Sequence, residues 1–348
     1  MLKKPIFTLI FTFFWVLFPF LPVFAGSGLN GRFIILDPGH GIESDNTYLY
    51  YSEQATMLHL ALTLKPLLES EGATVFLTRP DIHNVSLPVR AAKMNLWSLE
   101  FLKNYLYQDI YSLLSTDRIE GINGRPQPPG EILDLLSEVY YLSEIMENII
   151  YNYRYFAPLY FNFPFDFNFE REISTYLERI FELQTHPQVR DRFLVISLHS
   201  NATPRPINHS VNGADVYYMS NFHRPSNNYF ANYANEGRSR YFGNLILDNI
   251  DNLGITRRHL RPGNWFVIRE HNLTGVLVEN GFHTNPYDRE KLSDNDFLDE
   301  LALAYVDAIL KYFDEIYLTS SFEGKPPIRP LQTFFMRLFP PNISSLIF

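Results

Sequence analysis

Short apolar runs and helical patterns alternate near the start of the chain. The run 33–36, Phe-Ile-Ile-Leu, is bulky and rich in β-branched residues, as in a buried strand, and the Pro-Gly pair after it cannot continue a central strand's hydrogen-bond ladder. Residues 53–72 have apolar side chains near helical spacing, and 73–81 contain a second strand pattern that ends in a turn. Strand, helix and strand in this order predict a βαβ unit, and therefore an α/β fold in which helices cover a sheet with parallel neighbours.

The middle of the chain changes to long amphipathic helix patterns. Two such patterns, 96–115 and 131–156, flank the breaker run EGINGRPQPPGE. Phenylalanine then recurs at every second position from 161 to 169. That alternation fits either an edge strand interrupted by Pro164 or a loop that packs several rings, and the pattern does not separate the two.

The α/β pattern resumes near residue 191. Strand patterns recur there and helix patterns follow them, at 193–202, 213–218, 229–252, 275–281 and 296–317. We therefore predict one discontinuous α/β domain, 31–95 and 191–317, with 96–190 as a helical insertion between its halves.

The two ends of the chain have patterns of their own. Residues 1–25 combine Lys3 and Lys4, an aromatic-rich apolar core and a small-residue site before Gly26, which predicts an export signal peptide. The apolar core is long enough that an uncleaved membrane anchor is the alternative. In either case we expect the rest of the chain outside the inner membrane, in the periplasm or at the cell wall. The Pro-rich tail 318–348 fits both packing on the core and binding of a partner.

Composition narrows the chemistry. The chain has no cysteine, so any metal must be held by His, Asp or Glu, and thiol nucleophiles are excluded. Its formal net charge is −9, or −11 without the two lysines of the signal, and it has no long basic run. Nucleic acid is therefore not expected as a partner, because phosphate binding needs clustered Lys and Arg.

Three predicted strands end on ionisable residues, and a fourth such residue opens the first helix. His40, His199 and Glu279 follow apolar runs, and Glu53 stands at the helix start. Because strand ends of a parallel sheet lie side by side, these side chains can meet at one edge. Two imidazoles and a carboxylate suit a hydrolytic zinc site, and a second carboxylate can take a proton from the attacking water. Taken singly, Glu53 also fits a solvated first-turn residue, and His199 an interior histidine.

The motifs also carry a family resemblance. LDPGHG, a Glu 13 positions after its histidine, LTRPD, ISLHSNA, GADVYY and VLVENGFHTNPYD occur in the order found in zinc-dependent N-acetylmuramoyl-L-alanine amidases of the amidase_3 group, which this chain resembles over about 31–95 and 191–310. The resemblance implies a mixed, mostly parallel sheet with helices on both faces. It also implies cleavage, in peptidoglycan, of the amide bond between N-acetylmuramic acid and L-alanine.

Site residues follow from the same resemblance. His40, Glu53 and His199 match the ligands of one Zn²⁺, and Glu279 matches the catalytic glutamate. Asp37 fits either an acceptor that orients the His40 loop or a turn former. Arg90 fits either a clamp on a structural carboxylate, which we favour, or a contact to the stem peptide. His283, four positions after Glu279, is expected to be exposed.

The insertion is the main departure from the family pattern. One hypothesis is that it covers the cleft and inhibits the enzyme until a protein activator draws it aside; the plainer alternative is a side domain that enlarges the core. Two other functions remain as alternatives, a zinc peptidase acting on stem peptides and a non-catalytic peptidoglycan-binding protein. A membrane contact is expected only through an uncleaved signal.

Overall fold

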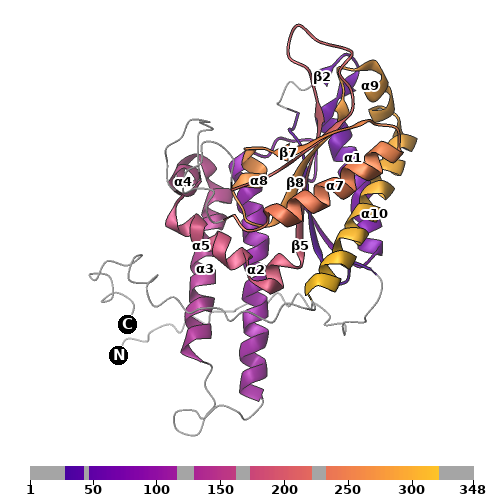
Figure 1. Ribbon diagram of the computed structural model, residues 1–348. Helices are drawn as coiled ribbons and strands as arrows, with labels where there is room; N and C mark the ends of the chain where they lie inside the picture. Colours follow the sequence, from indigo (N-terminus) through magenta and orange to yellow (C-terminus); the bar gives the residue numbers. More distant parts are fainter. Residues whose placement is uncertain (1–27, 43–46, 116–128, 162–172, 222–232, 321–348) are drawn as a thin grey trace, which may run out of the picture.

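A six-stranded sheet forms the centre of the computed structural model, which describes residues 28–42, 47–115, 129–161, 173–221 and 233–320 (Figure 1). Its strand order is β4-β1-β5-β8-β6-β7. All neighbours pair in parallel except β6 and β8, which are antiparallel. The predicted α/β class with a mixed, mostly parallel sheet is thereby confirmed. The strands are β1 (Phe33–Pro38), β4 (Thr74–Leu77), β5 (Phe193–Asn201), β6 (Ala214–Tyr218), β7 (Arg257–Pro262) and β8 (Thr274–Phe282).

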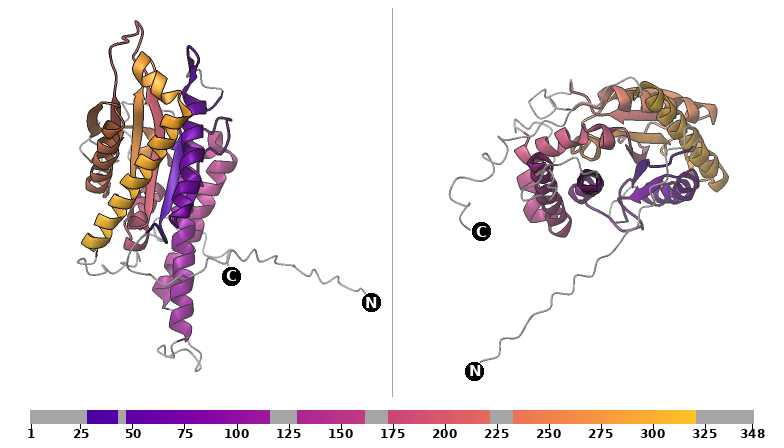
Figure 2. Two further views of the ribbon diagram at one scale, coloured as in Figure 1. Left: turned by 90° about the vertical axis from the view of Figure 1, so that its right-hand side faces the viewer. Right: turned by 90° about the horizontal axis from the view of Figure 1, so that it is seen from below.

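Helices cover both faces of the sheet (Figure 2). On one face α1 (Glu53–Ser70), α7 (Glu236–Asn252) and α10 (Asn295–Ser320) share an apolar core with alternate residues of β1, β5, β6 and β8. The other face is covered by helices that share a core with residues such as Phe33 and Phe193. They are α2 (Leu87–Ser115), α3 (Gly130–Tyr151), α4 (Tyr153–Tyr160), α5 (Thr175–Gln184), α6 (Pro187–Arg190) and α8 (Phe266–Arg269).

The predicted insertion begins inside a helix. α2 starts next to the end of β1 and runs on without a break through residue 96, and with α3 it extends beyond the sheet at the end away from His40 (Figure 1). A buried ion pair ties α3 to α5, since Arg179 donates to both carboxylate oxygens of Glu138 at 2.8 and 2.9 Å. The described insertion helices therefore pack as part of the sheet's second layer.

Some predicted elements differ from those observed. The single helix expected over 131–156 is two helices, because Asn152 leaves helical geometry (φ −145°, ψ 74°) between α3 and α4. The helix expected from 229 begins at Glu236 within the described residues. Sequence patterns also missed α9 (Pro286–Leu292) and the edge strand β7, whose RRHLRP stretch has no apolar run.

Several predictions fall on residues outside those described. These are the signal peptide at 1–25, most of the phenylalanine alternation and the tail from 321 onward. Among the described helices, none is both long enough and apolar enough to cross a membrane.

Candidate metal centre and active site

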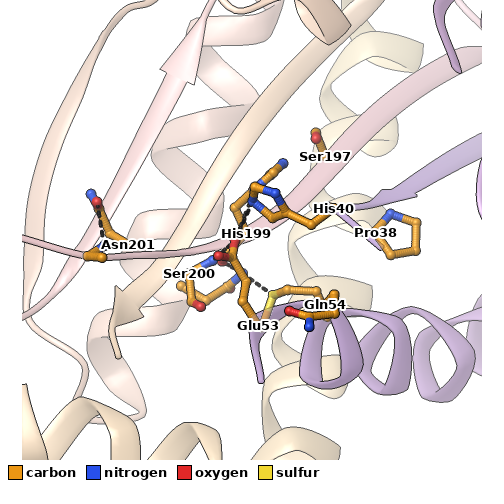
Figure 3. Close-up of polar contacts among 12 residues, drawn as sticks. Pro38, His40, Glu53, Gln54, Ser197, His199, Ser200 and Asn201 are labelled. Carbon is orange, nitrogen blue, oxygen red and sulfur yellow. Dashed lines mark hydrogen bonds and ion pairs between the residues drawn. The ribbon is translucent and has the colours of Figure 1, made fainter. Parts of the chain in front are cut away.

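Three predicted ligands meet at the ends of β1 and β5. One carboxylate oxygen of Glu53 lies 3.2 Å from His40 Nε2 and 3.1 Å from His199 Nδ1. Ligand atoms of the three residues all lie within 4.8 Å of one another. Figure 3 shows the two imidazoles and the Glu53 carboxylate pointing toward one another from three separate elements.

Contacts within the protein fix the position of the Glu53 side chain. It is the first residue of α1, is almost fully buried, and accepts a hydrogen bond from the backbone N–H of Ser200 at 3.1 Å. Burial opposes its ionisation, but hydrogen bonds from His199 and His40 outweigh that effect and leave the pKa of Glu53 well below its ordinary value. The solvated first-turn alternative is wrong for this residue, which is buried and faces the two histidines.

The His40 loop requires unusual backbone geometry. His40 itself has φ +59°, a left-handed conformation that costs a non-glycine residue roughly 1–3 kcal/mol. Gly39 packs directly against His199, since a Cβ atom at Gly39 would come within 2.4 Å of the His199 ring. The Pro-Gly turn after β1 thus places one ligand in a strained conformation and leaves room for the other.

Two buried arginines support this strained loop. Arg90 donates to the carbonyls of Pro38, at 2.6 Å, and of His40, and forms an ion pair with Asp37 at 2.9 Å. Arg79 donates to the carbonyls of Pro38 at 3.2 Å and Gly39 at 3.0 Å. Sequence reasoning did not single out Arg79, although it lies in the LTRPD motif.

Asp37 is fully buried behind the loop. Its carboxylate accepts hydrogen bonds from the hydroxyls of Thr78 and, at 2.7 Å, Ser197, besides the ion pair with Arg90. Burial disfavours the charge, but Arg90 and the two hydroxyls together hold the pKa of Asp37 below its usual range. The geometry thus fits the reading of Asp37 and Arg90 as supports of the His40 loop.

Glu279 lies next to the cluster on the neighbouring strand. It is the register partner of His199 across β5 and β8, and its Oε2 atom is buried with no hydrogen-bond partner among the described residues. Burial chiefly raises the pKa of Glu279, to about 8; His199 opposes the shift, and Glu53 and Asp215 add to it. A carboxyl group with a raised pKa beside a metal site suits both accepting and returning a proton.

The same register extends the row to the sheet edge. Asp215 on β6 pairs with Glu279 on one side and with His259 of β7 on the other. His259 Nδ1 lies 2.7 Å from the Asp215 carboxylate. Four ionisable residues therefore run across four neighbouring strands, and sequence analysis recognised only the first two of them, His199 and Glu279.

The expectation that His283 is exposed is wrong. Its side chain is buried, stacks on Tyr51 at 5.1 Å between ring centroids, and hydrogen-bonds through Nδ1 to Ser200 Oγ at 3.0 Å. Tyr51 donates to the same oxygen at 2.8 Å. The burial has a simple cause. β8 ends at Phe282, His283 N–H donates to the carbonyl of Asn201 at the end of β5, and the His283 ring lies against the hairpin β2 (Thr47–Tyr48) and β3 (Tyr51–Ser52).

The donor set fits a zinc ion. Two imidazole nitrogens and one carboxylate oxygen, from His40, His199 and Glu53, are the ligand types of catalytic zinc sites that keep a fourth position for water. The set alone also suits other divalent metals. A mixed α/β sheet that carries such a cluster at its strand ends, with the carboxyl group of Glu279 beside it, has the side chains of a candidate hydrolytic metal site.

The chain belongs to the Amidase_3 family, described as N-acetylmuramoyl-L-alanine amidase, whose family model matches residues 34–102 and 176–311. The two matched segments contain the His40, Glu53 and His199 cluster and Glu279, and 103–175 lie between them.

Individual relatives are more distant or match a shorter stretch. The probable cell wall amidase LytH of Staphylococcus saprophyticus is 44% identical over 69 residues, which cover 19% of this chain and 24% of that protein. The match thus spans about a quarter of this curated relative's length. Among solved structures, the catalytic domain of the amidase CwlV from Bacillus (Paenibacillus) polymyxa var. colistinus is 17% identical (TM-score 0.43; 81% of this chain, 98% of that one). Ami1 from Mycobacterium smegmatis is 16% identical (TM-score 0.46; 83% and 100%).

Proposed function

We propose that this protein hydrolyses the amide bond between N-acetylmuramic acid and L-alanine in peptidoglycan, with one Zn²⁺ held by His40, Glu53 and His199. The observation that carries the proposal is the convergence of three ligand atoms within 4.8 Å, with Glu279 as the register partner of His199. Membership of the Amidase_3 family indicates which bond is cleaved. We further propose that the protein is exported and acts in cell-wall remodelling or daughter-cell separation.

The protein's own groups divide the work of hydrolysis. When bound, the zinc ion supplies Lewis acidity, which polarises the scissile carbonyl and acidifies water. Glu279 takes a proton from the attacking water and returns it to the nitrogen of the leaving L-alanine, as its partner-free Oε2 and raised pKa allow. Gly39 and the carbonyl contacts of Arg79 and Arg90 keep the ligands in place during turnover.

Product analysis tests the proposal directly. Purified 26–348 is incubated with peptidoglycan, with and without zinc, beside Glu279→Gln and a matched control, Glu290→Gln on the surface of α9. We expect stem peptides with an L-alanine N-terminus, lost in Glu279→Gln and after chelation, while that variant still binds zinc. Release of stem-peptide fragments without the L-alanine terminus would favour a zinc peptidase. Zinc and peptidoglycan binding without any product would leave two alternatives, a masked enzyme and a non-catalytic binding protein, and the same assay on a variant with a shortened insertion would decide between them.

Glu279 weighs against a pure binding role. A carboxyl group whose Oε2 is buried and without a partner among the described residues is costly, and it is retained beside an intact ligand set. A module that only binds peptidoglycan has no need of it.

Autoinhibition by the insertion, relieved by a protein activator, stays a separate hypothesis. It predicts that shortening the insertion raises the rate on purified peptidoglycan. One variant removes 108–134, which includes the described ends of α2 and α3, and leaves the Glu138–Arg179 pair intact. A folded variant with unchanged activity would contradict inhibition by this projection and favour the packing role.

A further inference from the structure

The sheet edge nearest to Glu279 is basic. β7 is an edge strand of sequence Arg-Arg-His-Leu-Arg-Pro, and its residues 257, 259 and 261 are solvent-exposed. Register places His259 beside Asp215 and Arg261 beside Tyr217. His259 and Arg261 therefore lie on the same face of the sheet as Glu279, while Arg257 turns to the opposite side, toward Asp248 of α7.

The negative charge between Glu279 and this edge is compensated. Asp215 is buried, its carboxylate lies 2.7 Å from His259 Nδ1, and Arg258 Nε approaches it at 3.7 Å. Because Nδ1 is engaged by Asp215, Nε2 is the ring nitrogen left for a ligand, and it donates to a second carboxylate when the ring carries both protons. About half of the His259 side chain is exposed. Asp215 therefore presents no uncompensated charge to an anion that approaches this face of the edge.

Arg261 is presented in a defined orientation. Its Nη2 donates to the hydroxyl of Tyr217 at 2.6 Å, and its guanidinium lies 5.0 Å from the centre of the Tyr217 ring. Tyr217 is itself buried and packs edge-on against Trp265. Among the described residues, no carboxylate lies within ion-pair distance of Arg261, so its charge is available to a ligand.

The proposed substrate has one charged arm. Its glycan is neutral, whereas the stem peptide carries carboxylates, the first of them on the second residue. Neighbouring strands lie about 4.8 Å apart, so His259 lies roughly 10 Å from the Glu279 position. A second stem residue reaches about 7 Å from the scissile bond, because each residue spans at most about 3.6 Å, and the long Arg261 side chain covers the rest.

We propose that Arg261 and His259 bind the carboxylate of the second stem-peptide residue, and so direct the peptide from Glu279 across β6 to the β7 edge. The inference rests on the proposed function, because it assigns the stem peptide of that substrate to the β7 side of the site. Arginine and histidine on an edge strand can also serve only to prevent strand pairing between molecules. A role in substrate binding further requires that the effect of these residues on binding depend on the carboxylate of the ligand.

A matched substrate pair tests this dependence. The substrates are muramoyl tetrapeptides whose second residue has either a free α-carboxylate or its amide, and the enzymes are the zinc-loaded wild type, Arg261→Ala, His259→Gln and the control Arg257→Ala. We expect Arg261→Ala to raise KM for the free acid about tenfold or more, the loss typical of a charge-assisted hydrogen bond, with kcat nearly unchanged. His259→Gln should raise it less, and neither variant should change KM for the amide.

Binding provides a second readout that needs no catalysis. Calorimetry with the chelated protein measures the affinity for the free stem tetrapeptide, which we expect to fall about tenfold in Arg261→Ala and to be unchanged in Arg257→Ala. The inference would be overturned if Arg261→Ala changed KM equally for the acid and the amide. It would also be overturned if Arg261→Ala bound the free peptide as tightly as the wild type does. If neither the wild type nor the variant without 108–134 cleaves either substrate, the proposed function is refuted, and the peptide affinity still decides on Arg261.

Discussion

Replacing Arg90 with methionine should remove buried contacts that support the His40 loop and so destabilise the protein. The guanidinium is buried and contacts the Asp37 carboxylate at 2.9 Å and the carbonyls of Pro38 and His40. Removing one partner of a buried ion pair costs about 3–5 kcal/mol, because the remaining charge stays buried. At about 2–4 °C per kcal/mol for a chain of this size, the melting temperature should fall by roughly 10 °C.

Loss of the loop support should also weaken metal binding. Residues that position metal ligands typically contribute about 10–100-fold in affinity, so the zinc Kd of Arg90→Met should rise within that range. Thermal melting and zinc titration measure the two effects, with Arg257→Met as a control, because its partner Asp248 is exposed and such pairs contribute at most about 1 kcal/mol. In a double-mutant cycle, Asp37→Asn should cost less in the Arg90→Met background than in the wild type. A variant that melts like the wild type, binds zinc normally and shows only a raised KM would refute the structural role and make Arg90 a substrate contact.

Three further predictions concern the metal centre and stability. Gly39→Ala should weaken zinc binding, because its Cβ would displace the His199 ring, whereas Gly130→Ala has open space around it and should not; equal zinc titrations would contradict this. Zinc at 100 times its Kd should stabilise the wild type by about 2.7 kcal/mol but not Glu53→Ala, as measured by denaturant unfolding. His271 is fully buried, and burial lowers its pKa to about 4. Its folded pKa lies below the unfolded value of about 6.5, so its contribution is fully present above pH 6.5 and is lost as the pH falls toward 4, by up to about 3 kcal/mol. His271→Asn should show a flatter dependence of unfolding free energy over this range.

The predictable part of the site consists of residues that directly follow buried strands. His40, His199 and Glu279 were found because each ends an apolar run, and parallel strand ends share one edge of a sheet. Glu53 needed the family pattern as well, since a first-turn glutamate is ordinary in a helix. These signals are local in sequence, which is why they could be recognised without coordinates.

Other features depend on contacts between distant segments. The edge strand β7 was missed because one exposed edge and three arginines among six residues leave no apolar run to detect. His283 was predicted to be exposed but is buried, because a hairpin distant in sequence folds over it.

The sequence by itself determined the α/β class and singled out His40, Glu53 and His199, which the structure brings together; the discontinuous domain with a helical insertion stays a prediction. Tertiary structure alone decided how they are supported and extended: the carbonyl contacts of Arg79 and Arg90, and the register that aligns Asp215 and His259 with Glu279. The physical reason is that strand order and register arise from packing the whole sheet, and no local pattern in β6 or β7 specifies which residue of β8 lies beside them.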